Sequence, residues 1–361
     1  MVYIHGGNFV HLSASSVFGF LYTGSKPGDA EGNYGIRDQR LALQWVQQNI
    51  KYFGGDPTMV TLFGQSAGGQ SIPVHLMAKD SKDLFRNVII ESAPFDIPFK
   101  TKTEATYLAS TVIGLLNCTD AGDDYMSCLR SKSTDELAEA QHDSRTKPTS
   151  LKVLDFFEPL GPFVDGDVVP FEIITAIYGN KLRQVPTMIG TLSEEARIFV
   201  YEAWGKPLTL PEYIAVLFAT YPSHLGEMLQ QYPPSADGDN RDILTRYVFN
   251  HAFSFPGWGK FSYCEGHVCH GEEIAYVFHS ADRSGFDFSA DEERLSDELI
   301  AYWTNFAYTS DPNSGPHKIN ISWPTYDSNS TMLQFQTPKS ASIQNYLKNK
   351  CDFWDSIGYS A

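Results

Sequence analysis

Basic residues are scarce in this chain. Its 361 residues include 27 Lys and Arg against 43 Asp and Glu, which gives a formal net charge of −16 at pH 7. No basic cluster stands out in the sequence, which argues against nucleic acid or an anionic membrane as a partner. We interpret the acidic surface as serving solubility, and the alternative is that it steers cationic substrates toward a site.

Other signatures are missing as well. The sequence has no glycine-rich phosphate loop, no internal repeat, no low-complexity tract and no membrane span, so we expect no cofactor. The nearest approach to a metal-ligand pattern is the group Cys264, His267, Cys269 and His270. Two cysteines and two histidines in one short segment are more economically explained as a disulfide beside a functional histidine, and we expect no metal.

The composition agrees with a globular chain rather than with a disordered or fibrous one. Hydrophobic residues make up 42% and charged residues 19% of the chain, enough for a sizeable core. Strand-like and helix-like segments alternate over the first hundred residues, which predicts a parallel sheet with helices on both faces. The apolar run Val88–Ile90 is typical of a buried strand. Helices are predicted over residues 211–221, 240–253 and 291–308.

One pentapeptide carries a strong chemical signal. Gly64-Gln65-Ser66-Ala67-Gly68 follows the apolar run Val60–Phe63 and precedes a helix-like segment. Strand, sharp turn and helix are the context of a nucleophile elbow, in which a serine hydroxyl is presented at the tip of a strained turn. We therefore predict that Ser66 is a catalytic nucleophile. The alternative is that Ser66 only caps a helix.

A second glycine-rich turn follows the first predicted strand. Val2–Ile4 leads into His5-Gly6-Gly7-Asn8, where glycines would expose backbone N–H groups. Such a loop, together with the N–H of the residue after the nucleophile, forms the oxyanion hole of acyl-transfer enzymes. We predict Gly7, Asn8 and Ala67 as the oxyanion-hole residues, with a plain turn as the alternative for the loop.

Further segments resemble a known family. The stretch from Gly32 to Ile50 and the following Phe53–Pro57 are similar to the type-B carboxylesterase and cholinesterase family of α/β-hydrolases, and the similarity continues to Cys351–Asp355. It implies an α/β-hydrolase fold, with a doubly wound, mostly parallel sheet and helices on both faces. It also implies hydrolysis of small carboxylic esters through an acyl-serine intermediate.

The resemblance further implies a Ser-Glu-His triad in that chain order. Glu195 matches the second acidic residue of the family pattern after a predicted strand at 185–190, with Glu194 as the alternative. Two solvated glutamates at a helix start are the structural alternative. His270 matches the histidine of the family's H-G-x-E segment, and His267 is its rival. Because Ser66 and His270 must converge, we expect one catalytic domain over residues 1–361.

The cysteines and sequons suggest a compartment. Cys118 and Cys128 flank a short loop that resembles a disulfide-closed loop of the family. Cys264 and Cys269 could form a second bond, which would leave Cys351 unpaired. Three N-glycosylation sequons, at Asn117, Asn320 and Asn329, fit a secretory route. We expect a secreted glycoprotein, although no signal peptide precedes Val2 in this chain.

The chain departs from the family near its beginning. The resemblance implies that the N-terminal strands are missing, and residues 11–16 pass directly into Val17–Leu21, where the family has a further strand. The Val2–Ile4 strand is then expected to be an edge with unpaired backbone groups. An inactive truncated paralogue, or a non-catalytic cholinesterase-like interaction domain, is therefore the alternative to an active esterase.

Overall fold

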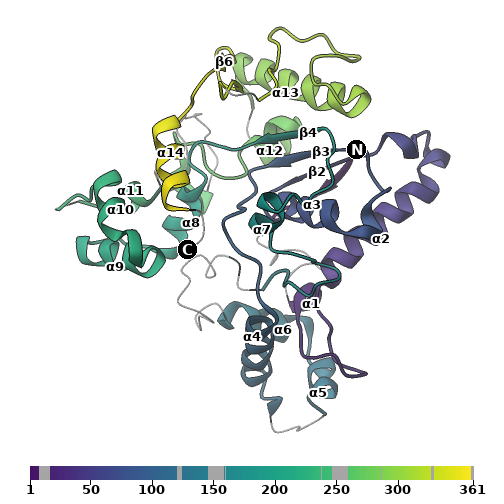
Figure 1. Ribbon diagram of the computed structural model, residues 1–361, viewed down its shortest axis with the longest axis vertical. Helices are drawn as coiled ribbons and strands as arrows, with labels where there is room; N and C mark the ends of the chain where they lie inside the picture. Colours follow the sequence, from purple (N-terminus) through teal and green to yellow (C-terminus); the bar gives the residue numbers. More distant parts are fainter. Residues whose placement is uncertain are drawn as a thin grey trace. The chain divides into compact units, whose positions relative to one another are not determined.

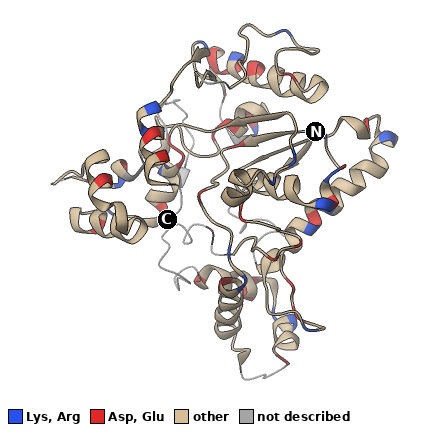
Figure 2. Cartoon of the chain, in the orientation of Figure 1, with Lys and Arg blue, Asp and Glu red and all other residues tan. Residues whose placement is uncertain are grey.

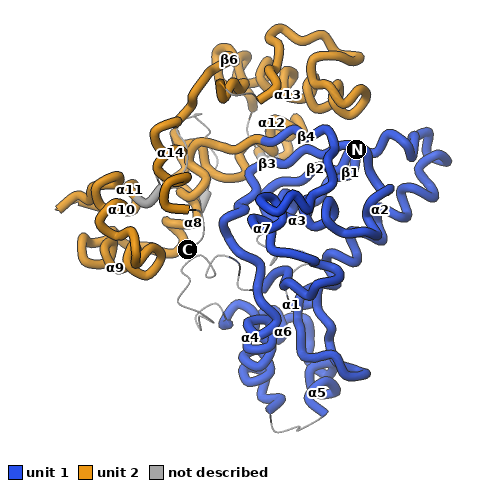
Figure 3. Tube along the Cα trace, viewed as in Figure 1, with its two compact units in different colours: residues 1–189 blue, residues 190–361 orange. Residues whose placement is uncertain are grey.

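The structure is a computed structural model of the chain. It describes residues 1–7, 17–119, 124–144, 158, 160–236, 238–245, 259–285, 287–326 and 329–358. The chain divides into two compact units, Met1–Ile189 and Gly190–Ala361 (Figure 3). Each unit is described by itself below. The expectation of one domain over residues 1–361 stays a prediction.

A sheet forms the centre of the first unit (Figure 1). Its order is β1-β2-β3-β4, with the bounds Val2–Ile4, Thr61–Gln65, Asn87–Glu91 and Thr187–Gly190. β1 and β2 are parallel, and so are β2 and β3. Parallel neighbours need long crossover connections, and helices supply them here. The strands predicted around 2–4, 60–63, 88–90 and 185–190 are confirmed.

The two central strands of the sheet, β2 and β3, are buried on both faces. Every residue of β2 and β3 is buried, as expected of strands inside a parallel sheet. Leu62, Val88 and Ile90 share one face of the sheet and pack into a single apolar cluster with Leu43 of α2 and Ile72 of α3. The helices that connect the strands therefore also cover this face.

The first unit contains seven α-helices within its described residues: α1 (Val17–Phe20), α2 (Tyr34–Asn49), α3 (Ala67–Met77), α4 (Lys102–Leu115), α5 (Tyr125–Ser131), α6 (Thr134–Ser144) and α7 (Ile173–Tyr178). Short 3₁₀ helices are η1 (Ile50–Phe53), η2 (Pro57–Met59) and η3 (Lys79–Ser81). Helix α4 begins with a capping box formed by Thr101 and Glu104. Together with α5 and α6 it builds a separate apolar cluster, in which Cys118 is wholly buried.

The second unit is mainly helical. Its elements are α8 (Ala196–Ala203), α9 (Leu210–Thr220), α10 (Leu225–Gln231), α11 (Arg241–Thr245), α12 (Glu273–Val277), α13 (Ala290–Thr309), α14 (Lys348–Ile357), β5 (Met332–Gln334), β6 (Ala341–Ile343), η6 (Pro222–His224), η7 (Gly259–Cys264) and η8 (Asp282–Ser284). The helices predicted over 211–221 and 291–308 are confirmed as α9 and α13. The helix predicted over 240–253 begins as α11, and residues 246–253 lie outside the described residues.

Charged residues are distributed over the helices of both units (Figure 2). Helix α13 begins at the cap Ser289 and carries Asp291, Glu292 and Glu293 in its first turn, where the exposed N–H groups of a helix favour negative charge. None of the helices in the described part of the chain is both long and apolar enough to cross a membrane.

Candidate active site

Ser66 occupies a strained position between β2 and α3. Its backbone angles are φ 58° and ψ −127°, and its side chain is almost wholly buried, with 2% of the residue exposed. A non-glycine residue in such a conformation costs on the order of 1–3 kcal/mol and persists only where the surroundings impose it. A neighbouring strand holds the Ser66 backbone in place, because the Ser66 N–H donates to the carbonyl oxygen of Glu91 at 2.9 Å. The strand-turn-helix context predicted from the sequence is present.

The Ser66 hydroxyl does not cap the helix. Ser66 stands at the N-cap position of α3, yet its side chain accepts no capping hydrogen bond. A serine that served only as a cap would accept one from the second or third N–H of the helix. The alternative reading of Ser66 as a structural cap is therefore wrong.

Close backbone packing explains the glycines around Ser66. A Cβ on Gly64 would lie 2.7 Å from the carbonyl carbon of Gly68, and a Cβ on Gly6 would lie 2.8 Å from the Cβ of Ser66. A Cβ on Gly68 would collide with the backbone oxygen of Ile4. The end of β1 and the start of α3 thus approach each other more closely than any side chain would allow.

This approach brings the predicted oxyanion loop to the elbow. β1 pairs with β2 so that Ile4 lies opposite Gly64, and the chain then turns at Gly7 with φ 110°. Ala67 is the first residue of α3, where backbone N–H groups have no partner within the helix. A cavity of about 120 Å³ beside the elbow is lined in part by Gly6 and Ala67. Asn8, the third predicted oxyanion residue, lies outside the described residues.

A buried polar chain supports the elbow helix, and motif analysis missed it. Ser71 donates to the Ala67 carbonyl at 2.9 Å, Gln39 Nε2 donates to Ser71 at 3.2 Å, and His75 Nε2 lies 3.0 Å from Gln39 Oε1. Because a carbonyl only accepts, this order of donors makes Nε2 the protonated nitrogen of His75, and the Ser81 hydroxyl then donates to Nδ1 at 3.0 Å.

His75 is held neutral within this chain. Burial, reinforced by the nearby Arg40 charge, lowers the pKa of His75 to about 3. The histidine therefore acts as a fixed donor and acceptor between α2 and α3 rather than as a base. A lone histidine within an apolar helix gives no sequence signal of this role.

The second unit pairs His270 with Glu195. His270 Nδ1 lies 2.5 Å from Glu195 Oε2, and both side chains are largely buried. The other oxygen of Glu195 accepts hydrogen bonds from the Leu192 N–H at 2.6 Å and the Thr191 hydroxyl at 2.8 Å. Since a carboxylate only accepts, the proton of a neutral His270 resides on Nδ1 and Nε2 is the basic nitrogen.

Phe199 packs against the imidazole of His270. The two ring centroids are 5.0 Å apart and the rings are tilted by 57°. Phe199 is in α8, and Glu195 is the N-cap residue of the same helix, so the aromatic ring and the carboxylate come from one short segment. The sequence gives no sign of this contact, because nothing distinguishes Phe199 from the other phenylalanines among the 24 in the chain.

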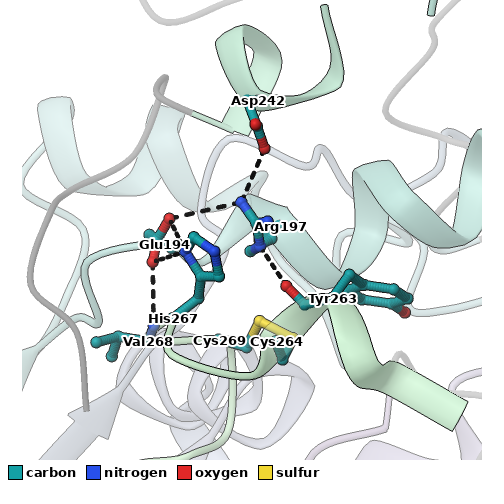
Figure 4. The surroundings of a disulfide bond; sticks show 8 residues. All are labelled: Glu194, Arg197, Asp242, Tyr263, Cys264, His267, Val268 and Cys269. Carbon is teal, nitrogen blue, oxygen red and sulfur yellow. Dashed lines mark hydrogen bonds and ion pairs between the residues drawn. A yellow bond between two sulfur atoms is a disulfide. The ribbon is translucent and has the colours of Figure 1, made fainter. Parts of the chain in front are cut away.

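The acidic and basic alternatives left open by the sequence form two adjacent glutamate–histidine pairs. Glu194 faces His267. The Nδ1 atom of His267 lies 2.9 Å from each of the two carboxylate oxygens of Glu194 (Figure 4). The side chain of His267 is 37% exposed, whereas that of His270 is 11% exposed. The geometry therefore matches the pair Glu195 and His270 to the roles predicted for them, although these roles stay predictions.

Two disulfides are present. Cys118 and Cys128, the pair implied by the family resemblance, are bonded, and so are Cys264 and Cys269. Cys351 is free and exposed. Among the residues that the structure describes, no group of three or more His, Cys, Asp or Glu side chains is arranged to hold a metal ion.

Comparison with known proteins decides the family. The model of the carboxylesterase family matches residues 15–218 and 239–354. This chain belongs to the carboxylesterase family. Its members share the α/β-hydrolase fold, which agrees with the parallel sheet of the first unit, and the family acts on small carboxylic esters.

This carboxylesterase-family chain is similar to proteins from two organisms, including the following three. It is 31% identical to the crystal protein of Dictyostelium discoideum over 95% of the chain, and 31% identical to the cAMP-regulated D2 protein of the same organism over 84%. It is 29% identical to the acetylcholinesterase of Bungarus fasciatus over 94% of the chain. The matches span 67%, 61% and 62% of the lengths of these relatives, respectively.

Proposed function

We propose that this chain is a serine carboxylic-ester hydrolase. The observation that carries the proposal is the hydrogen bond between His270 and Glu195. A carboxylate at Nδ1 fixes the tautomer in which Nε2 can accept a proton, and it stabilises the imidazolium that forms. The strained conformation of Ser66 and its uncapped side chain support the assignment of the nucleophile.

The proposed reaction has two halves. In the first, His270 takes the proton of Ser66 as Oγ attacks the ester carbonyl, and then delivers that proton to the leaving alcohol. An acyl-Ser66 intermediate remains. In the second half, His270 activates water in the same manner, and the carboxylate product leaves Ser66 regenerated. Glu195 stays ionised and orients the imidazole throughout.

The negative charge on the substrate oxygen needs donors. We propose the backbone N–H groups of Gly7 and Ala67, together with Asn8, for this role. The position of Ala67 at the first turn of α3 supports its part, because helix N-termini favour negative charge. Each fixed donor in such a site contributes about 3–4 kcal/mol to the lowering of the barrier.

Kinetics of single variants test the function. With a short-chain aryl ester as substrate, Ser66→Ala and His270→Ala should each lower kcat by about 10⁵- to 10⁶-fold, because triad members act as a unit. Glu195→Gln should lower it by about 10⁴-fold, because the amide can force the wrong tautomer on His270. An organophosphate should label Ser66 covalently, as peptide mass spectrometry would show.

A folded chain without these properties would decide against catalysis. If the protein unfolds cooperatively yet neither hydrolyses esters nor reacts with the organophosphate, the chain is a non-catalytic interaction domain or an inactive paralogue. Ser71, a buried serine in the helix that follows Ser66, is the internal control for the labelling. Mass spectrometry should find Ser71 unlabelled.

We also propose that the protein follows a secretory route. Two disulfides support the proposal, because disulfides persist in oxidising compartments. The asparagines of all three sequons, Asn117, Asn320 and Asn329, are exposed, as an acceptor of a bulky glycan must be.

A further inference from the structure

The residue just before His270 belongs to a disulfide. Cys269 is bonded to Cys264, five residues earlier, and both cysteines are wholly buried. The cross-link closes a short loop whose last residue is joined by one peptide bond to His270. The backbone from which the imidazole projects is therefore fixed on its N-terminal side by a covalent bond.

Glu194 holds the end of the same loop. Its N–H donates to the Val268 carbonyl, and the Val268 N–H donates back to its carboxylate, both at 3.1 Å. His267 adds contacts of 2.9 Å to both carboxylate oxygens. Glu194 also forms a parallel β-bridge with Cys269. The residues before Glu195 and before His270 are thus paired with each other.

Arg197 holds the beginning of the loop. Its Nε donates to the Tyr263 carbonyl at 2.5 Å, and its guanidinium lies 2.9 Å from Asp242 and 3.7 Å from Glu194. The Arg197 side chain is buried and that of Glu194 is largely buried, whereas Asp242 is half-exposed, so the pair with Glu194 is the more shielded from water. Figure 4 shows dashed lines from Glu194 to His267, Val268 and Arg197, with the disulfide drawn on the same loop. We call Glu194, Arg197, His267 and Val268 the Glu194 brace.

The brace and the disulfide connect the two chain segments that carry the His270–Glu195 pair. Glu194 and Arg197 flank Glu195 in sequence, while Val268 and Cys269 precede His270. A shift of either segment would change the short contact between His270 and Glu195. The other disulfide offers a natural contrast, because Cys118–Cys128 lies in the first unit, in the cluster formed with α4, α5 and α6.

We propose that the Glu194 brace and the Cys264–Cys269 disulfide position the His270 imidazole against Glu195, which makes Glu194 a positioning residue for ester hydrolysis. This inference rests on the proposed function. It assigns Glu194 a role distinct from that of Glu195: Glu194 acts through the backbone of the histidine segment and takes no proton.

A proton resonance measures this positioning without any substrate. In the full chain labelled with ¹⁵N-histidine, the Nδ1 proton shared between His270 and Glu195 should give a far-downfield signal. Glu194→Gln and the pair Cys264→Ala/Cys269→Ala should lose or broaden it. The matched pair Cys118→Ala/Cys128→Ala also removes one disulfide but should retain the signal. Circular dichroism establishes that each variant is folded under the conditions of measurement.

Kinetics provide the second readout. Glu194→Gln and the Cys264→Ala/Cys269→Ala pair should lower kcat by about 10- to 100-fold with KM nearly unchanged, as expected for a misplaced catalytic group. The Cys118→Ala/Cys128→Ala pair should keep kcat per folded molecule. If the Cys264→Ala/Cys269→Ala chain does not fold, Glu194→Gln alone decides.

The two proposals fail separately. A wild-type chain that shows the resonance but hydrolyses no ester would overturn the function, and the response of the resonance to Glu194→Gln would still decide the positioning. The positioning is overturned if the wild-type chain lacks the resonance. It is also overturned if folded Glu194→Gln retains both the resonance and full kcat.

Discussion

Glu272 is a buried carboxyl group two residues after His270. It is 4% exposed, and neither of its carboxyl oxygens makes a hydrogen bond of normal geometry with a described residue. Burial, together with the charges of Glu292 and Glu194, raises the pKa of Glu272 to about 9. The group is therefore neutral at pH 7, where an exposed glutamate would be ionised.

The raised pKa makes stability depend on pH. Between the ordinary pKa of 4.5 and the folded value of about 9, the folded state retains a proton that the unfolded state has lost. The free energy of unfolding therefore falls as pH rises through this window, by about 1.4 kcal/mol per pH unit for one proton. Below pH 4.5 both states are protonated and the effect is absent.

Glu272→Gln replaces the buried titratable carboxyl group with an amide that does not ionise, and it should therefore stabilise the protein at alkaline pH. We expect its gain in Tm over wild type to be small at pH 5 and to increase toward pH 8, as measured by thermal unfolding in matched buffers. Glu265→Gln, at an exposed position of the same segment, is the control and should show no such trend. An equal Tm difference at both pH values would contradict the prediction.

Individual site residues differ in how far the sequence predicts them. Ser66 is predicted because an elbow needs glycines at fixed offsets, and His270 and Glu195 because the family motifs have the same order. The partners of Glu194 are not predictable in this way. Its contacts with His267 and Val268 join segments more than 70 residues apart, and no local pattern records such a pairing.

At the scale of elements, α3 depends on its first glycines. The start of this helix lies directly against the backbone of Ile4 at the end of β1, and Gly68 is the point of contact. The contact therefore fixes the position of α3 relative to β1, although the two elements are distant in sequence. The same contact fixes the direction in which the helix N-terminus points, and with it the Ala67 N–H.

Gly68→Ala should therefore destabilise the protein. Its Cβ would meet backbone atoms, which cannot rotate away, and we expect a loss of about 1–3 kcal/mol in chemical unfolding. Gly114→Ala is the matched control, because Gly114 lies in α4 with open space around it. That variant should gain about 0.4–1 kcal/mol. Similar effects of the two substitutions would refute the steric argument.

Elements with strong periodicity were predicted well. β2, β3, α9 and α13 follow from apolar runs or amphipathic spacing that local chain geometry demands. The short helices α8 and α12 of the second unit, with only 8 and 5 residues, were not predicted. Helices this short are stabilised by tertiary packing rather than by their own sequences.

At the scale of the whole molecule, the exposed sequons and the disulfides point to one folding environment. Expressed with a secretory leader in a eukaryotic host, the protein should carry N-linked glycans. Enzymatic removal of these glycans should lower its mass, and the triple variant Asn117→Gln/Asn320→Gln/Asn329→Gln should show no such change. A wild-type mass that is unaffected by deglycosylation would argue against the secretory proposal.

The backbone angles of Ser66 have an evolutionary consequence. At φ 58° and ψ −127°, glycine is the residue that suffers least, so a serine there lowers the stability of the fold. Under the proposed function, the hydroxyl gives selection a reason to retain such a residue. In a duplicate gene released from that function, mutation toward glycine at position 66 would be favoured, and the rest of the sequence could stay unchanged. The residue at this single position would then record whether a lineage still relies on the chemistry.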